Sequence, residues 1–448
     1  MPKPVSSLLP SSATTTASAR RRWQLLLALA FSTEMLFFTR LRGCAGPYWS
    51  PLVFGGAGLL LGGAALGALR GRAFVLAPAA VVSRRVSWGG LAWLVGALLV
   101  LYRQIPIVLG SPIDLRSSDV IPIVQTYVDR FRSGEVVYRY LTNLPYPLFP
   151  NHLPLQWLPY VPVQPLGVDF RWVSWALLLG VGIGAYQLVA LRLPGGWLHY
   201  GLKALLPALL LCQIIDADYY LYSQVLEPTI IAYYFLLAAS ILVGPAWARG
   251  GALVLCLLSR YSVVFWVPVF LWILWREVGP RHALAVAAVV LAGIVGIYIM
   301  PFFAHNPTIF THALAEYRLA TLGEWSRSDG AGGLPPHVGN GLSAAPWFYA
   351  LPLPLEAKIA WIQRAHALLS ASAAAALALF YWRRGQRYDY RYLALVGLKL
   401  YLVVFYFFIQ IPYSYLISLS VLLSVFVVLV ALAPTVPRAA AAGAADLA

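Results

Sequence analysis

Apolar stretches long enough to cross a lipid bilayer recur along this chain and constrain its fold more than any other feature. A membrane-spanning helix needs about 20 mostly apolar residues. With 60% hydrophobic and 11% charged residues over 448 positions, the chain is too apolar for two or three soluble domains. We predict an all-α integral membrane protein with roughly 10–12 transmembrane helices. Examples of these stretches are Leu91–Leu109, Trp172–Leu191, Ala283–Phe303, Ile359–Trp382 and Leu393–Ile411.

The basic residues gather at the ends of the apolar stretches. A net charge of +16 would suggest nucleic acid as the partner of a soluble protein, but in a membrane protein short basic loops stay in the cytoplasm. We therefore predict a multi-pass protein of the plasma or inner membrane with a cytoplasmic N-terminus and no nucleic-acid partner. The clusters are Arg20–Arg22, Arg70 with Arg72, Arg84 with Arg85, Arg249, Arg276 with Arg281, and Arg383, Arg384, Arg387 with Arg391.

The predicted organisation is a cytoplasmic tail over residues 1–22, a membrane domain over 23–433 and a second cytoplasmic tail over 434–448. The first apolar run has no clear cleavage site and is expected to stay as a helix. Two long polar interruptions, at about 110–170 and 304–357, break the helical pattern. Counting crossings from the N-terminus places both loops outside.

The first loop contains an amphipathic pattern between Val120 and Phe131, with apolar residues at helical spacing and polar ones on the other face. It predicts an interfacial helix that lies along the lipid head groups. A proline-dense stretch from Pro145 to Pro165 follows, and prolines at this density exclude one continuous helix. Irregular backbone at that depth must be buried in protein or line a wet cavity.

Arg260 interrupts the apolar region Ala252–Leu274. A charge at that position is expensive in lipid, so the region is either one span with a functional arginine facing a cavity or two short helices that return to the same side. The hairpin is favoured because the arginines on both flanks, Arg249 and Arg276, should be cytoplasmic.

The first loop also carries the densest chemical signal, in which Asp119 begins the predicted helix and the segment Tyr146-Pro-Leu-Phe-Pro150 follows it. This arrangement resembles the first external loop of the multi-spanning, type-C glycosyltransferases that use polyprenyl-phosphate sugars. The resemblance continues loosely at Glu227, like an acidic element at an outer helix end, and at Arg260, like the family's basic residue. It covers most of the chain in topology, although this chain has Pro-Asn-His-Leu-Pro where many members have adjacent prolines.

The resemblance implies a mannosyltransferase-like enzyme of the cell envelope. Its donor would be a polyprenyl-phosphate sugar, its acceptor a glycan or glycolipid, and Asp119 the catalytic carboxylate acting as general base. Sugar transfer needs a carboxylate for the acceptor hydroxyl and a cation for the departing phosphate. The alternative for Asp119 is a helix N-cap alone.

Arg260 can hold a phosphate of the donor bidentately, or it can form an ion pair with a structural partner. Asp216-Ala-Asp218 imitates a metal-binding Asp-x-Asp, but a solvated turn between two helices is the favoured interpretation. A divalent metal therefore stays an open question, and no nucleotide cofactor is expected.

The second loop, with its glycine-rich run and its tryptophan and tyrosine residues, suits either a substrate lid or an ordinary surface loop. Arg318 of this loop, Tyr127 of the predicted helix and His152 of the proline-dense stretch complete the expected substrate-binding set, with Arg260, Glu227, Asp216 and Asp218. The rival function is a transporter or a lipid or glycolipid flippase. An internal duplication would favour transport, and the sequence shows no convincing repeat of two halves.

Overall fold

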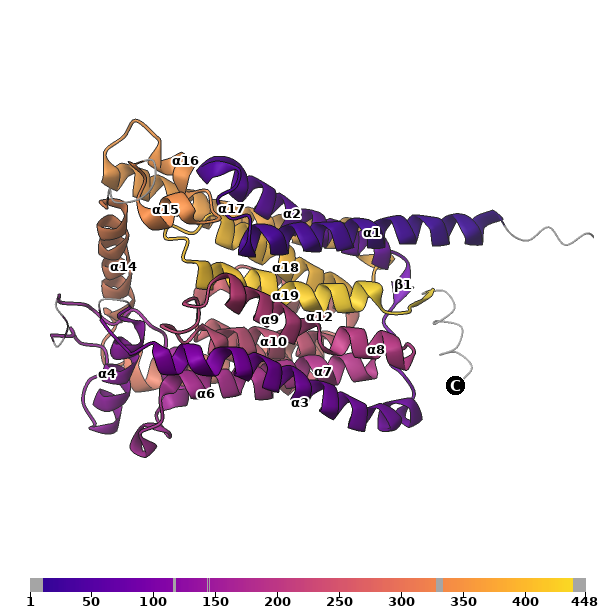
Figure 1. Cartoon of the computed structure of the whole chain (residues 1–448), viewed down its shortest axis with the longest axis horizontal. Helices are drawn as coiled ribbons and strands as arrows, with labels where there is room; N and C mark the ends of the chain where they lie inside the picture. Colours follow the sequence, from indigo (N-terminus) through magenta and orange to yellow (C-terminus); the bar gives the residue numbers. More distant parts are fainter. Residues whose placement is uncertain (1–10, 116–117, 143, 145, 328–332, 438–448) are drawn as a thin grey trace, which may run out of the picture.

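The protein is a bundle of roughly aligned helices with a layer of shorter helices and loops across one end (Figure 1). The computed structural model describes residues 11–115, 118–142, 144, 146–327 and 333–437. Almost all the regular structure is helical, which confirms the all-α prediction. The exception is a two-residue antiparallel ladder between β1 (Arg72–Ala73) and β2 (Val436–Pro437).

Within the described residues, seven helical segments are long and apolar enough to cross a membrane, which makes this a multi-pass membrane protein. Two of them contain a π-helical stretch. The segments are α2 (Gly46–Leu69), α3 (Ala79–Gly110), α6 (Phe170–Ala176) with η3 (Leu177–Gly182) and α7 (Ile183–Arg192), α13 (Pro280–Ile294) with η5 (Val295–Phe303), α17 (Leu355–Arg384) with η7 (Gly385–Arg387), α18 (Tyr390–Phe407) and α19 (Ser414–Leu432).

Further helices complete the bundle. The shorter apolar ones are α9 (Leu206–Ala217), α10 (Glu227–Val243) and α11 (Ala246–Leu257). A total of 10–12 crossings remains a prediction, since it depends on how these helices and α1 lie in the membrane. The other members are α1 (Ser11–Thr39), which begins inside the predicted tail 1–22, α8 (Trp197–Ala204) and α12 (Trp266–Glu277).

The two ends of the bundle differ in charge. At one end, which we call the basic end, the predicted arginine clusters lie together with both described termini (Figure 1). The Gly71 amide donates to the Arg387 carbonyl at 2.8 Å, and Arg20 donates to the Ala433 carbonyl at 2.8 Å. The opposite end, the loop end, carries both predicted external loops. Which side of a membrane each end faces remains a prediction.

The region around Arg260 is a helical hairpin, as the distribution of arginines predicts. Helix α11, a turn with η4 (Tyr261–Val263) and α12 follow one another, so a single span is excluded. Arg249 near the start of α11 donates to the carbonyls of Ser240 and Ile241 at the end of α10. Glu277 at the end of α12 accepts from Tyr381 at the end of α17 at 3.0 Å. Both open ends of the hairpin therefore lie at the basic end, with Arg260 at the turn.

Helix α4 (Val120–Arg132) occupies the residues of the predicted amphipathic helix. Its apolar side chains pack on aromatic residues of the same loop, Trp157 and Tyr160 among them, so protein rather than lipid covers this face. Its interfacial position remains a prediction. The other loop-end elements are α5 (Pro154–Trp157), η1 (Leu158–Tyr160), η2 (Gln164–Leu166), α14 (Ile309–Trp325), α15 (Pro336–Asn340) and α16 (Ala345–Tyr349).

A fully buried ion pair joins α1 to the centre of the bundle. Lys399 Nζ of α18 lies 2.5 Å from Glu34 Oε1 of α1, and both side chains are 0% exposed. Lys399 also donates to the carbonyl and the hydroxyl of Ser420, while the Ser424 hydroxyl donates to Glu34 at 2.7 Å. Both the Glu34 carboxylate and the Lys399 ammonium group therefore have several partners, which is the condition for keeping charges in a low-dielectric interior.

Replacing Lys399 by Met should lower the free energy of unfolding by about 3–5 kcal/mol, because it leaves Glu34 buried without a cation. The double variant Glu34→Gln with Lys399→Met should recover most of that loss. As a control, Arg139→Met breaks the exposed pair with Glu135 and should change stability by less than about 1 kcal/mol. Thermal melting in detergent measures all three. A Lys399→Met variant as stable as the parent would contradict this view of the pair.

The second prediction concerns topology. In a Cys44→Ser background, cysteines introduced at Ser133 and His305, both exposed at the loop end, should react with an impermeant maleimide added to intact cells. A cysteine at Ser83, exposed at the basic end, should react only after the membrane is opened. Protection of one loop-end position beside labelling of the other would show that the predicted topology is wrong.

Candidate functional site

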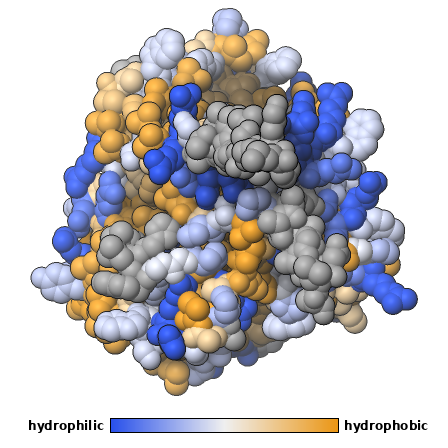
Figure 2. All heavy atoms as spheres, turned by 90° about the vertical axis from the view of Figure 1, so that its right-hand side faces the viewer, coloured by the Kyte–Doolittle hydropathy of each residue, from blue (hydrophilic) through white to orange (hydrophobic). Residues whose placement is uncertain are grey.

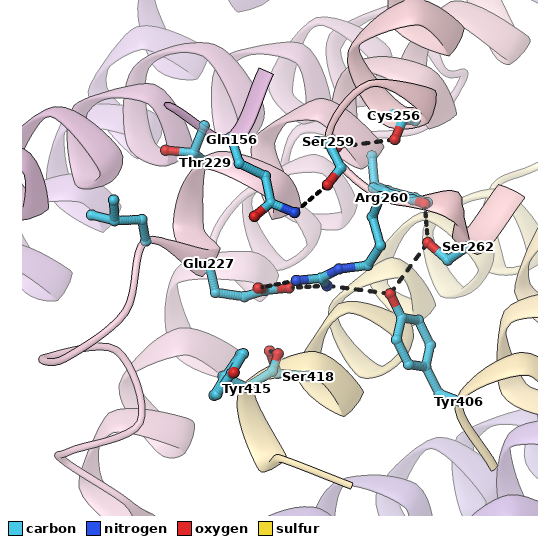
Figure 3. Close-up of polar contacts among 12 residues, drawn as sticks. Gln156, Glu227, Thr229, Cys256, Ser259, Arg260, Ser262, Tyr406, Tyr415 and Ser418 are labelled. Carbon is cyan, nitrogen blue, oxygen red and sulfur yellow. Dashed lines mark hydrogen bonds and ion pairs between the residues drawn. The ribbon is translucent and has the colours of Figure 1, made fainter. Parts of the chain in front are cut away.

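A bidentate ion pair lies where the hairpin turn meets the start of α10 (Figure 3). Arg260 donates from Nη1 to Glu227 Oε1 at 2.7 Å and from Nη2 to Glu227 Oε2 at 2.8 Å. Nη1 also donates to the Tyr406 hydroxyl of α18 at 3.4 Å. The Glu227 side chain is 2% exposed and that of Arg260 16%. The structure thus places Arg260 in an ion pair, and these hydrogen bonds use three of the five N–H donors of the guanidinium.

Asp119 occupies the N-cap position of α4 but does not cap it. Its side chain makes no capping hydrogen bond, and the Ser118 hydroxyl accepts from the Val120 amide instead. The Asp119 carboxylate accepts from the Tyr146 hydroxyl, with Oδ2 2.5 Å from the phenol oxygen. Burial and this hydrogen bond raise the pKa of the Tyr146 phenol above its usual range, so the phenol remains a donor. The Asp119 side chain is therefore held by Tyr146 and does not act as a helix cap.

His152 lies within the electrostatic range of both the Asp119 carboxylate and the Arg260 guanidinium. Burial lowers the pKa of its ring to about 4; the charge of Arg260 lowers it too, and that of Asp119 opposes the change. The ring is therefore neutral at physiological pH, and its Nδ1 lies 3.3 Å from the Tyr127 hydroxyl. The charges of Asp119, Glu227 and Arg260 also act together on Tyr415 at the start of α19. These three predicted residues are thus gathered in one part of the loop end.

The two loops contact each other next to this group. The Phe149 amide of the first loop donates to Glu316 of α14 at 3.2 Å, and the Phe149 ring meets His312 edge-on. Trp325 at the end of α14 is fully buried and donates to the Gln410 carbonyl, just after α18, at 3.0 Å. The second loop is therefore packed on both the first loop and the bundle.

The two aspartates of the Asp-x-Asp segment have separate partners. Asp216 pairs with Arg103 of α3 at 2.9 Å, and Asp218 lies 3.8 Å from Arg42, which follows α1. The charge of Asp218 and that of Glu227 both act on Tyr222. Within the described residues, no three His, Cys, Asp or Glu side chains are grouped as a metal site. The solvated-turn interpretation fits this geometry better than a metal site does.

The remaining predicted residues divide between core and surface. Tyr127 is 0% exposed within the aromatic cluster under α4, and burial raises the pKa of its phenol far above the usual value. Its hydroxyl group contacts the site at the His152 ring. Arg318 pairs with Glu356 at 2.9 Å in an exposed bridge between α14 and α17, away from the ion pair of Arg260.

Several contributors were not among the predicted residues. Tyr146 and Tyr406 hold the carboxylate of Asp119 and the guanidinium of Arg260, respectively. Tyr146 lies in the proline-dense segment that carries the family resemblance, which is the signal that could have indicated it. Glu34 and Lys399 were missed too, although each is a charge within an apolar stretch, a pattern that indicates a buried partner.

Comparisons with known proteins found no relative of this chain. No family model matches the chain, and neither a curated protein nor a solved structure matches it.

The low pKa of His152 predicts an acid-sensitive contribution to stability. The unfolded ring titrates near 6.5 and the folded ring near 4, so the unfolded state binds more protons between these values. Stability from this residue is complete above about pH 6.5 and is lost as the pH falls to about 4. The melting temperature of the parent should therefore fall more steeply across this window than that of His152→Gln. Parallel curves would contradict the assignment of a neutral buried ring.

Proposed function

We propose that the protein is a membrane glycosyltransferase that moves a sugar from a polyprenyl-phosphate donor to a glycan or glycolipid acceptor. The reaction would take place at the loop end, facing the outside of the plasma or inner membrane. The observation that carries this proposal is the half-buried Asp119 carboxylate, which occupies a cap position without capping and lies in the electrostatic range of His152, as Arg260 does. A purely structural aspartate would be expected to satisfy the helix terminus.

The proposed chemistry assigns one task to each group. Asp119 accepts the proton of the acceptor hydroxyl as that oxygen forms a bond to the anomeric carbon of the sugar. The bond from the anomeric carbon to the phosphate oxygen breaks, and the polyprenyl phosphate leaves with the electron pair. Tyr146 positions the carboxylate through its hydrogen bond. Since His152 is neutral, it does not compete with the acceptor for the Asp119 charge.

The developing phosphate charge requires a cation, and Arg260 is the candidate because its charge and that of Asp119 both act on His152. Its partner Glu227 is almost fully buried, so the guanidinium is held at the turn of the hairpin even without substrate. An anionic phosphate that replaces one of the two hydrogen bonds to Glu227 would meet a fixed, planar donor. Tyr406, which also contacts this guanidinium, would help to keep it in place.

A transporter or a lipid or glycolipid flippase is the second candidate. The observation in its favour is the pair between Glu34 and Lys399, because charges buried among spanning helices are typical of transport pathways. This pair is fully enclosed and satisfied by two serines, which supports a structural role equally well.

Asp119→Asn should lower sugar transfer from a polyprenyl-phosphate donor by at least about a hundredfold, because the amide cannot act as a general base. Membrane yield and melting temperature should be unchanged, since the Asp119 side chain makes no capping bond. The matched control is Asp129→Asn in the same helix, where the carboxylate accepts from the Gln164 amide at 2.6 Å. That variant should keep parental transfer.

Transfer by purified protein in liposomes measures the effect, with radiolabelled sugar on the donor. If Asp119→Asn transferred sugar at the parental rate, Asp119 could not be the general base. Donor lipid that crosses the liposome membrane without transfer of its sugar, in a manner that Lys399→Met abolishes, would favour the flippase instead.

A further inference from the structure

The excess positive charge of the protein is concentrated at its basic end. The acidic side chains described there are Glu277 and Asp389, whereas at the loop end arginines face a comparable number of carboxylates, as in the pairs of Arg103, Arg171, Arg260 and Arg318. Figure 2 looks onto the basic end, where hydrophilic residues lie among hydrophobic ones. The described basic residues of this end are Arg20, Arg21, Arg22, Arg70, Arg72, Arg84, Arg85, Arg192, Lys203, Arg249, Arg276, Arg281, Arg383, Arg384, Arg387 and Arg391.

Three of these arginines converge from two separate segments. Arg70 ends the α2 segment, while Arg384 and Arg387 belong to the end of α17 and the turn after it. The hydrogen bond from the Gly71 amide to the Arg387 carbonyl holds the two segments together at 2.8 Å. All three charges act on the buried phenol of Tyr388, whose pKa is raised by burial and lowered by each arginine. We call Arg70, Arg384 and Arg387 the arginine cluster.

The arginine cluster is exposed and lacks a carboxylate partner among the described residues. The two nearby acids are engaged elsewhere. Asp389 accepts from the amides of Phe74 and Arg391, both at 3.0 Å, and Glu277 accepts from Tyr381. Three guanidinium groups without a counter-charge repel one another, and an anion with several acceptor oxygens would relieve that repulsion.

Exposed tryptophans identify the surroundings of the cluster as a membrane interface. Each lies within three residues of an arginine in the sequence, and Trp382 directly precedes the pair Arg383 and Arg384. Tryptophan concentrates at the level of the lipid head groups, where its ring is apolar and its N–H is wet. A nucleic-acid surface would not need exposed tryptophans next to its arginines. The tryptophans are Trp23, Trp88, Trp247, Trp275 and Trp382, between 41% and 71% exposed.

We propose that the arginine cluster binds the phosphate of an anionic phospholipid in the leaflet at the basic end. The guanidinium groups contact the phosphate oxygens, and Trp382 lies beside the glycerol and the first part of the acyl chains. The site lies at the end of the bundle opposite to Asp119, so it is independent of the proposed sugar transfer.

The experiment uses the full chain in nanodiscs of phosphatidylcholine, titrated with phosphatidylglycerol and followed by native mass spectrometry. The cluster variant Arg70→Gln, Arg384→Gln, Arg387→Gln should weaken phosphatidylglycerol binding at least about tenfold, since each arginine near an anionic head group contributes roughly a fivefold change. The control variant Arg21→Gln, Arg84→Gln, Arg281→Gln removes three other exposed arginines of the same end and the same total charge. It should change binding less than about twofold.

Melting temperatures in detergent without added lipid verify that both variants fold. Equal weakening in the two variants would overturn the site, because it would mean that the whole basic surface attracts the lipid. Binding that is unchanged in the cluster variant would overturn it as well. Inorganic phosphate that competes at micromolar concentration would identify a soluble anion as the ligand, and a single-stranded oligonucleotide that displaces the lipid would identify nucleic acid. Either of these results would contradict a lipid site.

Discussion

The ion pair between Glu227 and Arg260 is the interaction on which the loop end of the structure depends. It fastens the turn of the hairpin to the start of α10, and the Tyr406 contact adds α18. A buried carboxylate and a guanidinium are stable in such a place only together, because either one alone would keep its desolvation penalty. The pair therefore fixes how deep the hairpin lies, and through it the position of the carbonyls that the first loop contacts, such as that of Ser259.

The proposed reaction takes place at the loop end of the bundle and the proposed lipid site lies at the basic end, and the two ends differ in their balance of charge. Carboxylates and arginines pair at the loop end, which leaves a mixed surface suited to a neutral acceptor and an anionic donor. Arginines dominate the basic end, where the proposed anionic lipid would supply the missing negative charge. One asymmetry of charge thus underlies both the predicted topology and the two proposed ligands.

The sequence predicted what depends on local pattern and on charge counting. Helical stretches follow from apolar runs, and the hairpin at Arg260 follows from the arginines that flank it. The pairings could not be predicted, because Glu227 and Arg260 are 33 positions apart and Glu34 and Lys399 are 365 apart. The sequence correctly placed Asp119 at the start of a helix. That its carboxylate does not cap the helix depends on Ser118, which accepts from the Val120 amide, and on Tyr146, 27 positions away, which donates to the carboxylate. Such contacts require the tertiary fold.

The central position of α19 has a consequence for biosynthesis. This helix is the most enclosed of the seven spanning segments, with 83% of its most apolar window buried, and it follows all of its bundle neighbours in the chain. Ser420 and Ser424, which satisfy Lys399 and Glu34, leave the ribosome after both of them. The earlier helices must therefore enter the translocon or the bilayer before the helix at their centre is made. Glu34 is synthesised more than 300 residues before Lys399, the lysine that neutralises it. The bundle can therefore reach its final packing only after α19 has been inserted.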